Sequence, residues 1–278
     1  MLKDLLTKKL TKKEISLVPS SFDIIGNKEK AIAIIEIPTQ LKKKKKIIAT
    51  ALMKQHKNIK TVLGKESPRK GRYRTRKLKI IKGKKNTEVL HVESGCRFLL
   101  DPKKVYFSPR EGTERMRIAE KINKNEVVAI FFAGVGPFAI IIGKKAKPKK
   151  IIGIEINPTA VKYFKENIRL NKLENVEIVE GDVEKEAKKF YKKCNRVLMP
   201  LPEKSEEYLE EAINCVKSGI IHFYCFSEED KISEKKRKIS SVAKKLKRKL
   251  KIISINNVLP YGPRIWKYRI DFKVRSLR

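Results

Sequence analysis

The sequence has 278 residues, 41% of them hydrophobic, which suffices for one large domain or two ordinary ones with an apolar core. It contains 68 Lys and Arg against 31 Asp and Glu, and the net charge of +37 favours binding to polyanions, most commonly nucleic acid. No apolar run approaches the ~18 residues of a membrane helix, and the charged N-terminal segment is not typical of a secretory signal. The composition therefore argues against a disordered, membrane-spanning or secreted chain, and we expect a cytoplasmic location.

The basic excess is concentrated in the first half of the chain. Residues 51–100 contain 15 basic and 3 acidic residues, whereas residues 151–200 contain 10 and 8. A uniform compositional bias predicts the same excess in both segments. The difference therefore indicates a region facing RNA or DNA in the first half.

Cysteine and histidine spacing gives no sign of a metal site. The four cysteines form no C-x-x-C pair, and the three histidines do not cluster with them. A zinc site and a disulfide framework are both disfavoured, and we expect no metal.

Residues 1–110 show short, β-like patterns. Apolar or alternating residues predict strands at 31–38, 75–83 and 87–94, and helical spacing predicts a helix after the lysine run 42–46. We interpret this region as a smaller, basic α+β domain.

Residues 111–278 show a different pattern, in which strands and helices alternate. Helices are predicted at 113–122, 137–146, 158–171, 184–192, 205–217 and 231–249. Strands are predicted at 126–134, 150–156, 175–181, 196–202, 219–227, 251–259 and 267–274. This alternation predicts a doubly wound α/β domain, whose parallel sheet is covered on both faces and ends in an antiparallel edge. Its ligand is expected at the carboxyl ends of the strands.

The segment FFAGVGPFAI, residues 131–140, has the glycine spacing of a ligand loop between a strand and a helix. A phosphate loop is excluded, because Gly134 and Gly136 are not followed by Lys and Ser or Thr. A dinucleotide loop is disfavoured, because Pro137 and Phe138 fill the space of the pyrophosphate. S-adenosylmethionine carries no phosphate and needs only small residues at the strand end, so it is the preferred ligand.

Two carboxylates follow the next two predicted strands. Glu155 of GIEINP lies about twenty residues after Gly134 and suits the ribose hydroxyls, as in other strand-end nucleotide sites. Asp182 of EGDV is expected beside the adenine. The alternatives are a carboxylate that favours a helix dipole for Glu155 and a helix N-cap for Asp182. Neither alternative accounts for the glycine pair and both carboxylates together.

The chain resembles a known enzyme family in several segments that occur in order from about residue 18 to 274. These are SFDIIG, IAIIEIP, HKNIKTVLGK, VYFSPREGTERMRIAEKI, FFAGVGPFAI, IEINPTAVKYFKENIRLNK and MPLP. Together they resemble the archaeal and eukaryotic tRNA guanine-N1 methyltransferases, which modify guanosine 37 beside the anticodon. The resemblance implies a Rossmann-like, S-adenosylmethionine-dependent methyltransferase domain at 111–278, preceded by a tRNA-binding domain at 1–110. It also implies binding to the anticodon stem-loop, and we expect the small N-terminal domain of many members to be missing. Nothing in the sequence demands an oligomer, so we expect a monomer.

The resemblance implies roles for individual residues. Methyl transfer to guanine N1 needs a base for the N1 proton and a cation near O6, and the family's catalytic pair matches Glu114 and Arg74. Tyr106 and Arg110 of VYFSPR match family residues beside the cofactor. The other expected cofactor-binding residues, at the glycine loop and the strand ends, are Phe132, Gly134, Gly136, Glu155 and Asp182. Pro200 and Pro202 align with the motif that lines the family's guanine pocket. The basic charge of the first domain makes Lys60, Lys65, Arg69, Arg72 and Arg76 candidate ligands for the phosphates of the substrate, with Arg264 and Lys267 near the C-terminus.

Two residues depart from the family pattern. Ile130 stands where members carry an acidic residue before the FAG of the glycine loop, and Pro200 stands where they carry an asparagine. Proline offers neither a polar side chain nor a backbone N–H. These departures leave open methylation of a tricyclic wyosine precursor at the same nucleoside, and a tRNA-binding protein without catalysis. Transfer of the aminocarboxypropyl arm of the cofactor is disfavoured by Pro137 and Phe138.

Overall fold

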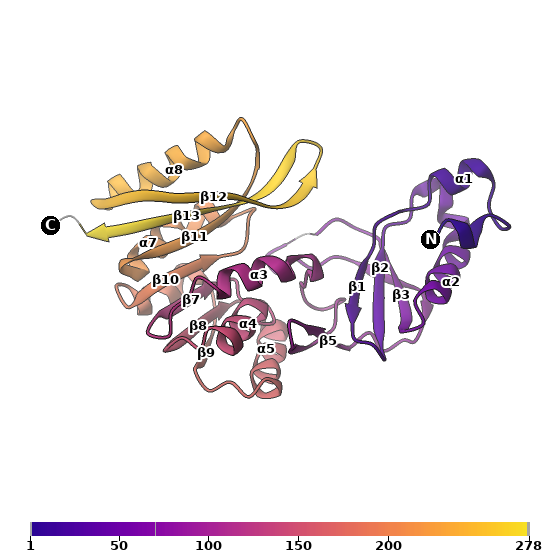
Figure 1. Cartoon of the computed structure of the whole chain (residues 1–278), viewed down its shortest axis with the longest axis horizontal. Coiled ribbons are helices and arrows are strands. Elements are labelled where there is room, and N and C mark those ends of the chain that lie inside the picture. Colours follow the sequence, from indigo (N-terminus) through magenta and orange to yellow (C-terminus); the bar gives the residue numbers. More distant parts are fainter. Residues whose placement is uncertain (1, 70, 277–278) are drawn as a thin grey trace. The chain divides into compact units, whose positions relative to one another are not determined.

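The computed structural model describes residues 2–69 and 71–276 of the chain. The chain divides into two compact units, an N-terminal unit of residues 1–110 and a C-terminal unit of residues 111–278. Figure 1 colours them from indigo to magenta and from magenta to yellow. Within the described residues, no helix is long and apolar enough to cross a membrane.

The N-terminal unit is built on a small sheet. Its strands are β1 (Asp23–Gly26), β2 (Ala31–Ile35), β3 (Ile59–Lys65), β4 (Leu78–Gly83), β5 (Val89–Glu93) and β6 (Cys96–Leu100). Its helical segments are η1 (Asp4–Leu6), α1 (Lys12–Ser16), η2 (Thr39–Lys44) and α2 (Lys45–Gln55). The sheet runs β1-β2-β3-β4, with β2 and β3 parallel and the flanking pairs antiparallel, and β5 pairs with β6 in a separate hairpin.

The apolar run of β2 lies at the centre of this unit. All five of its residues are buried, as expected for a strand covered on both faces. Helix α2 crosses over from β2 to β3 and packs Ile48 and Leu52 into the same core. Strand β3 was not predicted, because Lys60 and Thr61 interrupt its apolar residues.

The C-terminal unit is built on a larger sheet. Its strands are β7 (Val127–Phe131), β8 (Lys150–Glu155), β9 (Val176–Glu180), β10 (Cys194–Met199), β11 (Val216–Glu228), β12 (Arg248–Gly262) and β13 (Ile265–Ser276). Its helices are α3 (Gly112–Ala119), α4 (Pro137–Lys145), α5 (Pro158–Leu170), α6 (Val183–Glu186), α7 (Leu209–Cys215) and α8 (Ile232–Lys245). Shorter 3-10 turns are η3 (Pro109–Glu111), which begins in the N-terminal unit, η4 (Ala187–Phe190) and η5 (Ser205–Tyr208).

The order of this sheet is β12-β13-β11-β10-β7-β8-β9. Strands β11, β10, β7, β8 and β9 run parallel, and β13 pairs antiparallel with both β11 and β12. The predicted parallel sheet with an antiparallel edge is confirmed. β11, β12 and β13 are longer than predicted, and β11 already begins at Val216, which shortens the helix predicted at 205–217.

The two faces of this sheet differ in character near β11 and β13. Side chains alternate between the faces of a strand, so Phe223, Ile270 and Phe272 lie on one face, in an apolar core with residues of α7 and α8. The alternate residues of β11 and β13 lie on the face toward α3, where polar side chains are buried. This second face holds the chemistry described below.

Candidate active site

The loops that follow four neighbouring strands carry most of the predicted cofactor residues. Strands β10, β7, β8 and β9 are adjacent and parallel, so their carboxyl ends meet at one edge of the sheet. Backbone hydrogen bonds tie these loops together, from Ala133 N to Ile154 O (2.9 Å) and from Gly181 N to Glu155 O (2.9 Å).

The glycine loop after β7 requires left-handed backbone. Gly134 and Gly136 have φ of +59° and +84°, and Phe132 also has a positive φ of 55°. A Cβ on Gly136 would lie 2.1 Å from the ring of Phe164, whereas a Cβ on Gly134 would meet nothing within 4 Å. Gly136 is therefore needed for close packing on α5, and Gly134 leaves open space beside the strand end.

Glu155 at the end of β8 fastens this loop. Its two carboxylate oxygens accept hydrogen bonds from the backbone N–H groups of Gly134 (2.7 Å) and Asn157 (2.7 Å). The side chain is 8% exposed, and burial raises the pKa of its carboxyl although the backbone donors oppose this. Each oxygen retains acceptor capacity for a hydroxyl group.

The arrangement fits S-adenosylmethionine better than a dinucleotide. Pro137 occupies the first turn of α4 and removes one of the N–H groups that would bind a pyrophosphate at the helix N-terminus. The open space at Gly134 and the carboxylate of Glu155 suit the amino-acid moiety and the ribose diol. Phe132 contacts Tyr208 edge to face (4.9 Å between centroids), which brings an aromatic residue from the β10 loop beside the glycine loop.

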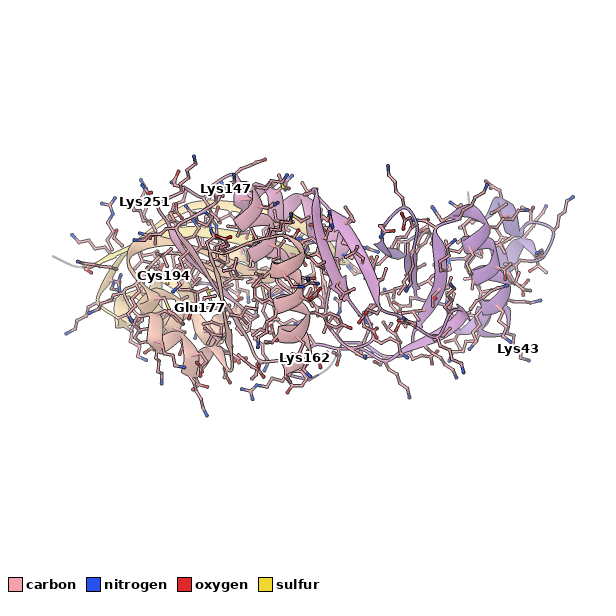
Figure 2. All side chains as sticks on the ribbon, turned by 90° about the horizontal axis from the view of Figure 1, so that it is seen from below. Lys43, Lys147, Lys162, Glu177, Cys194 and Lys251 are labelled. Atoms are coloured by element: carbon pink, nitrogen blue, oxygen red, sulfur yellow. The ribbon has the colours of Figure 1, made fainter. Side chains whose placement is uncertain are left out.

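Replacing Glu155 by Gln is expected to weaken S-adenosylmethionine binding about 10–100-fold, because a charge-assisted acceptor is lost and an amide NH₂ faces a backbone N–H. Isothermal titration of the purified protein measures the dissociation constant. Glu177→Gln is the matched control, since Glu177, labelled in Figure 2, lies on β9 in an ion pair with Lys150 (2.6 Å). Equal affinities for the two variants would contradict the assignment.

Three further predicted site residues lie in the loops at this edge of the sheet. Asp182 accepts a hydrogen bond from Glu184 N (3.0 Å) and caps α6, which is the alternative interpretation of this residue. Pro200 and Pro202 are half-buried in the loop after β10, where Ser205 Oγ donates to Met199 O (2.9 Å) and Leu201 O (2.6 Å). Ile130 stands where the resemblance places an acidic residue, and its apolar side chain is fully buried.

Glu114 on α3 is held in a second polar cluster of the C-terminal unit. It is 2% exposed. Its Oε1 accepts hydrogen bonds from Tyr224 Oη (2.7 Å) and from the guanidinium of Arg269. Its Oε2 is buried and makes no hydrogen bond among the described residues, and Arg117 Nη1 lies 3.9 Å from it.

Arg269 belongs to a chain of buried polar groups along the α3 face. Arg269 Nε donates to Asp271 Oδ1 (2.8 Å), and the same oxygen lies 2.7 Å from His222 Nδ1. Arg196 Nη1 lies 2.8 Å from His222 Nε2, and Arg196 Nη2 donates to Glu126 Oε1 (2.8 Å). Burial lowers the pKa of His222, so the ring is neutral, donates from Nδ1 to Asp271 and accepts at Nε2 from Arg196.

Sequence reasoning missed Tyr224, Arg269, His222 and Asp271. In the strands GIIHFYCFS and KYRIDFKV they alternate with apolar residues, a pattern typical of a solvent-facing side. The structure buries this side beneath α3. The residue types could have indicated burial, because Arg, Asp and His on one face of two paired strands favour a network of paired charges.

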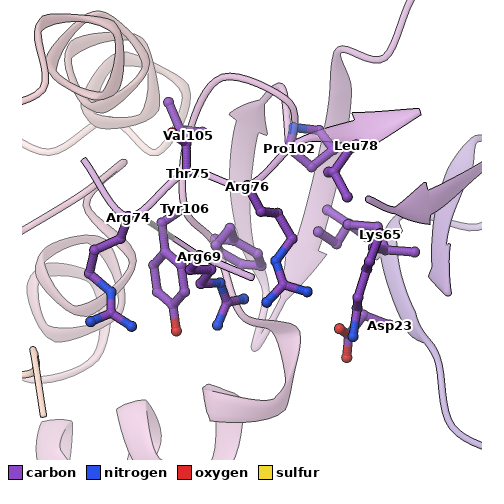
Figure 3. Close-up of a pocket in the computed structure, with 13 residues that line it drawn as sticks. Asp23, Lys65, Arg69, Arg74, Thr75, Arg76, Leu78, Pro102, Val105 and Tyr106 are labelled. Atoms are coloured by element: carbon purple, nitrogen blue, oxygen red, sulfur yellow. The ribbon is translucent and has the colours of Figure 1, made fainter. Parts of the chain in front are cut away.

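Five of the residues predicted to act in catalysis or binding line one pocket in the N-terminal unit. Figure 3 shows Arg74, Arg76 and Tyr106 together with Arg69 and Lys65. The guanidinium of Arg69 lies over the ring of Tyr106 (4.3 Å to the centroid), and that of Arg74 lies 5.8 Å from the same centroid. We call this the arginine pocket.

The remaining predicted positions fall outside these clusters. Arg110 binds Asp23 (Nε to Oδ1, 2.5 Å), Arg72 and Lys60 are exposed, and Arg264 is exposed in the β12–β13 turn. The prediction that Lys267 binds phosphate is wrong, because this side chain is 4% exposed and its Nζ pairs with Glu111 Oε1 (3.0 Å). No group of three or more His, Cys, Asp or Glu positioned to hold a metal ion occurs among the described residues.

A Rossmann-like sheet whose glycine loop is followed by Pro137 at the helix start, with a ribose-type carboxylate at Glu155, favours the class of S-adenosylmethionine-dependent methyltransferases over dinucleotide-binding proteins. Family profiles agree: that of the TRM5/TYW2 methyltransferase domain matches residues 89–253, and that of the TYW2 N-terminal domain matches residues 2–87. The chain belongs to the TRM5/TYW2 methyltransferase family. This confirms the resemblance, but the expectation of a missing N-terminal domain is wrong, because residues 2–87 match an N-terminal domain of the family.

Individual relatives are similar over most of the chain. The tRNA (guanine(37)-N(1))-methyltransferase Trm5b of Pyrococcus abyssi is 44% identical, over 92% of this chain and 76% of the relative. The tRNA (guanine(37)-N(1))/4-demethylwyosine(37)-methyltransferase Taw22 of Nanoarchaeum equitans is 32% identical, over 90% of this chain and 98% of the relative.

Solved structures of relatives share the fold. The complex of aTrm5 and tRNALeu superposes with a TM-score of 0.83 at 34% identity, covering 98% of this chain and 77% of the relative. Methanocaldococcus jannaschii TYW2 in complex with AdoMet has a TM-score of 0.72 at 28% identity, covering 92% of this chain and all of the relative. The expected Rossmann-like fold and the family's dependence on S-adenosylmethionine are confirmed.

Proposed function

We propose that the protein binds tRNA and transfers a methyl group from S-adenosylmethionine to N1 of guanosine 37. The relatives named for this activity support the proposal, and so does the state of Glu114. One oxygen of this buried carboxylate is fixed by Tyr224 and Arg269, and the other has no hydrogen-bond partner among the described residues. A buried, unsatisfied acceptor costs stability and is retained where a substrate donor completes it.

Glu114 Oε2 acts as the general base. S-adenosylmethionine supplies an electrophilic methyl group, and the electron pair of the breaking C–S bond stays on sulfur. Guanine N1 carries a proton, which Oε2 accepts as the N1 electron pair forms the bond to the methyl carbon. The family resemblance assigns Arg74 the contact with O6, where negative charge develops, and this assignment stays a prediction.

Tyr224 and Arg269 keep the base in position. Burial and then the charge of Glu114 raise the pKa of Tyr224 well above its usual value, so its hydroxyl stays a donor to Oε1. With Oε1 held by two donors, the carboxylate cannot rotate without breaking both bonds. Oε2 is therefore presented in one orientation, as general-base catalysis requires.

A second candidate substrate is a tricyclic wyosine precursor at the same nucleoside. The loop after β10 presents Pro200 and Pro202, and Ser205 already donates to the carbonyl oxygens of Met199 and Leu201. The loop thus offers mainly apolar rings where the family has an asparagine, which suits a larger base. The relative Taw22 carries both substrates in its name.

A competition assay distinguishes the two substrates. The purified protein is given S-adenosylmethionine and equal amounts of two tRNAs, one with unmodified guanosine 37 and one with 4-demethylwyosine. We expect guanosine to be methylated at the higher kcat/KM. Methylation of the tricyclic base alone would replace the proposal with the second candidate, and methylation of neither would favour a binding protein without catalysis.

A cytoplasmic location and a monomeric state remain predictions.

A further inference from the structure

The arginine pocket of the N-terminal unit gathers basic side chains around one acidic side chain. Among the described residues, Lys65, Arg69, Arg74 and Arg76 line it together with one carboxylate, Asp23. That carboxylate is already engaged by Arg110, which lies outside the lining (Nε to Oδ1, 2.5 Å). Figure 3 shows the guanidinium groups of the three arginines pointing to the same side of the pocket.

Holding these cations together costs free energy in the absence of an anion. Burial, and then the charge of Arg69, lowers the pKa of Arg76, and burial lowers that of Lys65. Arg76 Nε is buried and has no hydrogen-bond partner among the described residues. Glu36 approaches Lys65 only to 3.7 Å and is largely exposed, so it compensates little.

Tyr106 divides the pocket. Arg69 stacks on its ring at 4.3 Å and Arg74 lies farther out at 5.8 Å from the same centroid. Figure 3 shows Tyr106 between Arg74 on one side and Arg69 and Arg76 on the other. The stacked, planar guanidinium of Arg69 is pre-oriented for two-point contact with an oxyanion.

We propose that Arg69, Arg76 and Lys65 form a subsite for one phosphodiester group of the RNA backbone next to the target nucleoside, separate from Arg74. The proposal rests on tRNA being the substrate. A phosphodiester matches the subsite because its two non-bridging oxygens accept from a guanidinium fork, and Arg76 Nε lacks such an acceptor. Inorganic phosphate offers the same chemistry, and the experiment separates the two sources.

The test measures whether the loss of one arginine and the neutralisation of one phosphate have non-additive effects on RNA affinity. Wild type and Arg76→Gln are titrated, at one fixed salt concentration, with anticodon stem-loop RNA that carries a neutral methylphosphonate at each linkage near the target guanosine in turn. At one linkage, neutralisation is expected to weaken wild-type binding about 10-fold, as for loss of a charge-assisted hydrogen bond. The same neutralisation is expected to cost Arg76→Gln less than about 3-fold, because the contact is already gone.

Controls separate this coupling from general effects. Lys43→Gln removes one exposed charge of the same unit, on η2 and outside the pocket lining (Figure 2). This variant should lose affinity on neutralisation of the linkage as the wild type does. Arg69→Gln provides a second coupled variant if Arg76→Gln does not fold. Additive losses at every linkage for both arginine variants would overturn the proposal. The proposal would also be overturned if the arginine variants raised the S-adenosylmethionine dissociation constant without changing RNA affinity. The pocket would then bind the cofactor.

The readout does not depend on catalysis. Competition by inorganic phosphate beyond that of chloride at equal ionic strength, without linkage-specific coupling, would assign the pocket to free phosphate. Coupling at one linkage in a protein that forms no methylated product would uphold the subsite and refute the proposed function. The two claims therefore fail separately.

Discussion

Glu114→Gln is expected to lower kcat for tRNA methylation by about 10²–10⁴-fold, the usual contribution of a general base. Glutamine keeps the size of the side chain and can still accept from Tyr224 and Arg269 at its amide oxygen. Its NH₂ group then takes the place of Oε2 and cannot accept the N1 proton. Single-turnover kinetics with bound tRNA and S-adenosylmethionine measure the loss directly.

Binding should survive this substitution. We expect dissociation constants for S-adenosylmethionine and tRNA within about 3-fold of wild type. The substitution leaves untouched the contacts that hold the ground state and the transition state equally. Glu120→Gln is the matched control, as Glu120 is exposed at the end of the same helix. A kcat within a factor of about 3 of wild type for Glu114→Gln would remove Glu114 from the mechanism.

Arg269→Met is expected to destabilise the protein by about 3–5 kcal/mol, because it leaves buried carboxylates without their cation. Arg269 is 2% exposed and pairs with both Glu114 and Asp271. Methionine fills similar space without charge. Urea unfolding at neutral pH measures the change, with Arg275→Met, on the exposed end of β13, as the control.

The charge network around Arg269 also predicts how the stability of the protein depends on pH. Burial alone would raise the pKa of Asp271, but the hydrogen bond from His222 and the charge and hydrogen bond of Arg269 lower it from 3.8 to about 2. A lowered folded-state pKa contributes stability that is present above about pH 4 and is lost as the pH falls toward 2. In Arg269→Met this acid-dependent contribution should shrink. Equal destabilisation by Arg269→Met and Arg275→Met would contradict the account.

The place of Gly134, Gly136 and Glu155 at one edge of the sheet was predictable because the sequence signals are local. Gly134, Gly136 and Glu155 lie within one strand-loop-helix-strand segment, and each is required by backbone geometry or by a strand end. The expected antiparallel edge also followed from local alternation. The lengths of β11, β12 and β13 did not, because these strands gain residues through mutual pairing.

The partners of Glu114 were not predictable from spacing. Tyr224 and Arg269 are 110 and 155 residues away in sequence, and only the sheet order brings β11 and β13 under α3. The same reason explains the misplaced Lys267, which looked exposed in a basic strand and is buried against Glu111 and the ring of Tyr224. Charge alone does not distinguish a surface lysine from a paired one.

The most direct test of the central claim is the identity of the modified nucleoside. Unmodified tRNA with guanosine 37 is incubated with the protein and S-adenosylmethionine, digested to nucleosides and analysed by mass spectrometry, beside the Glu114→Gln variant. The account predicts N1-methylguanosine from wild type, mapped to position 37, and almost none from the variant. A methyl group on another atom or nucleoside, an aminocarboxypropyl product, or equal product from both proteins would contradict it.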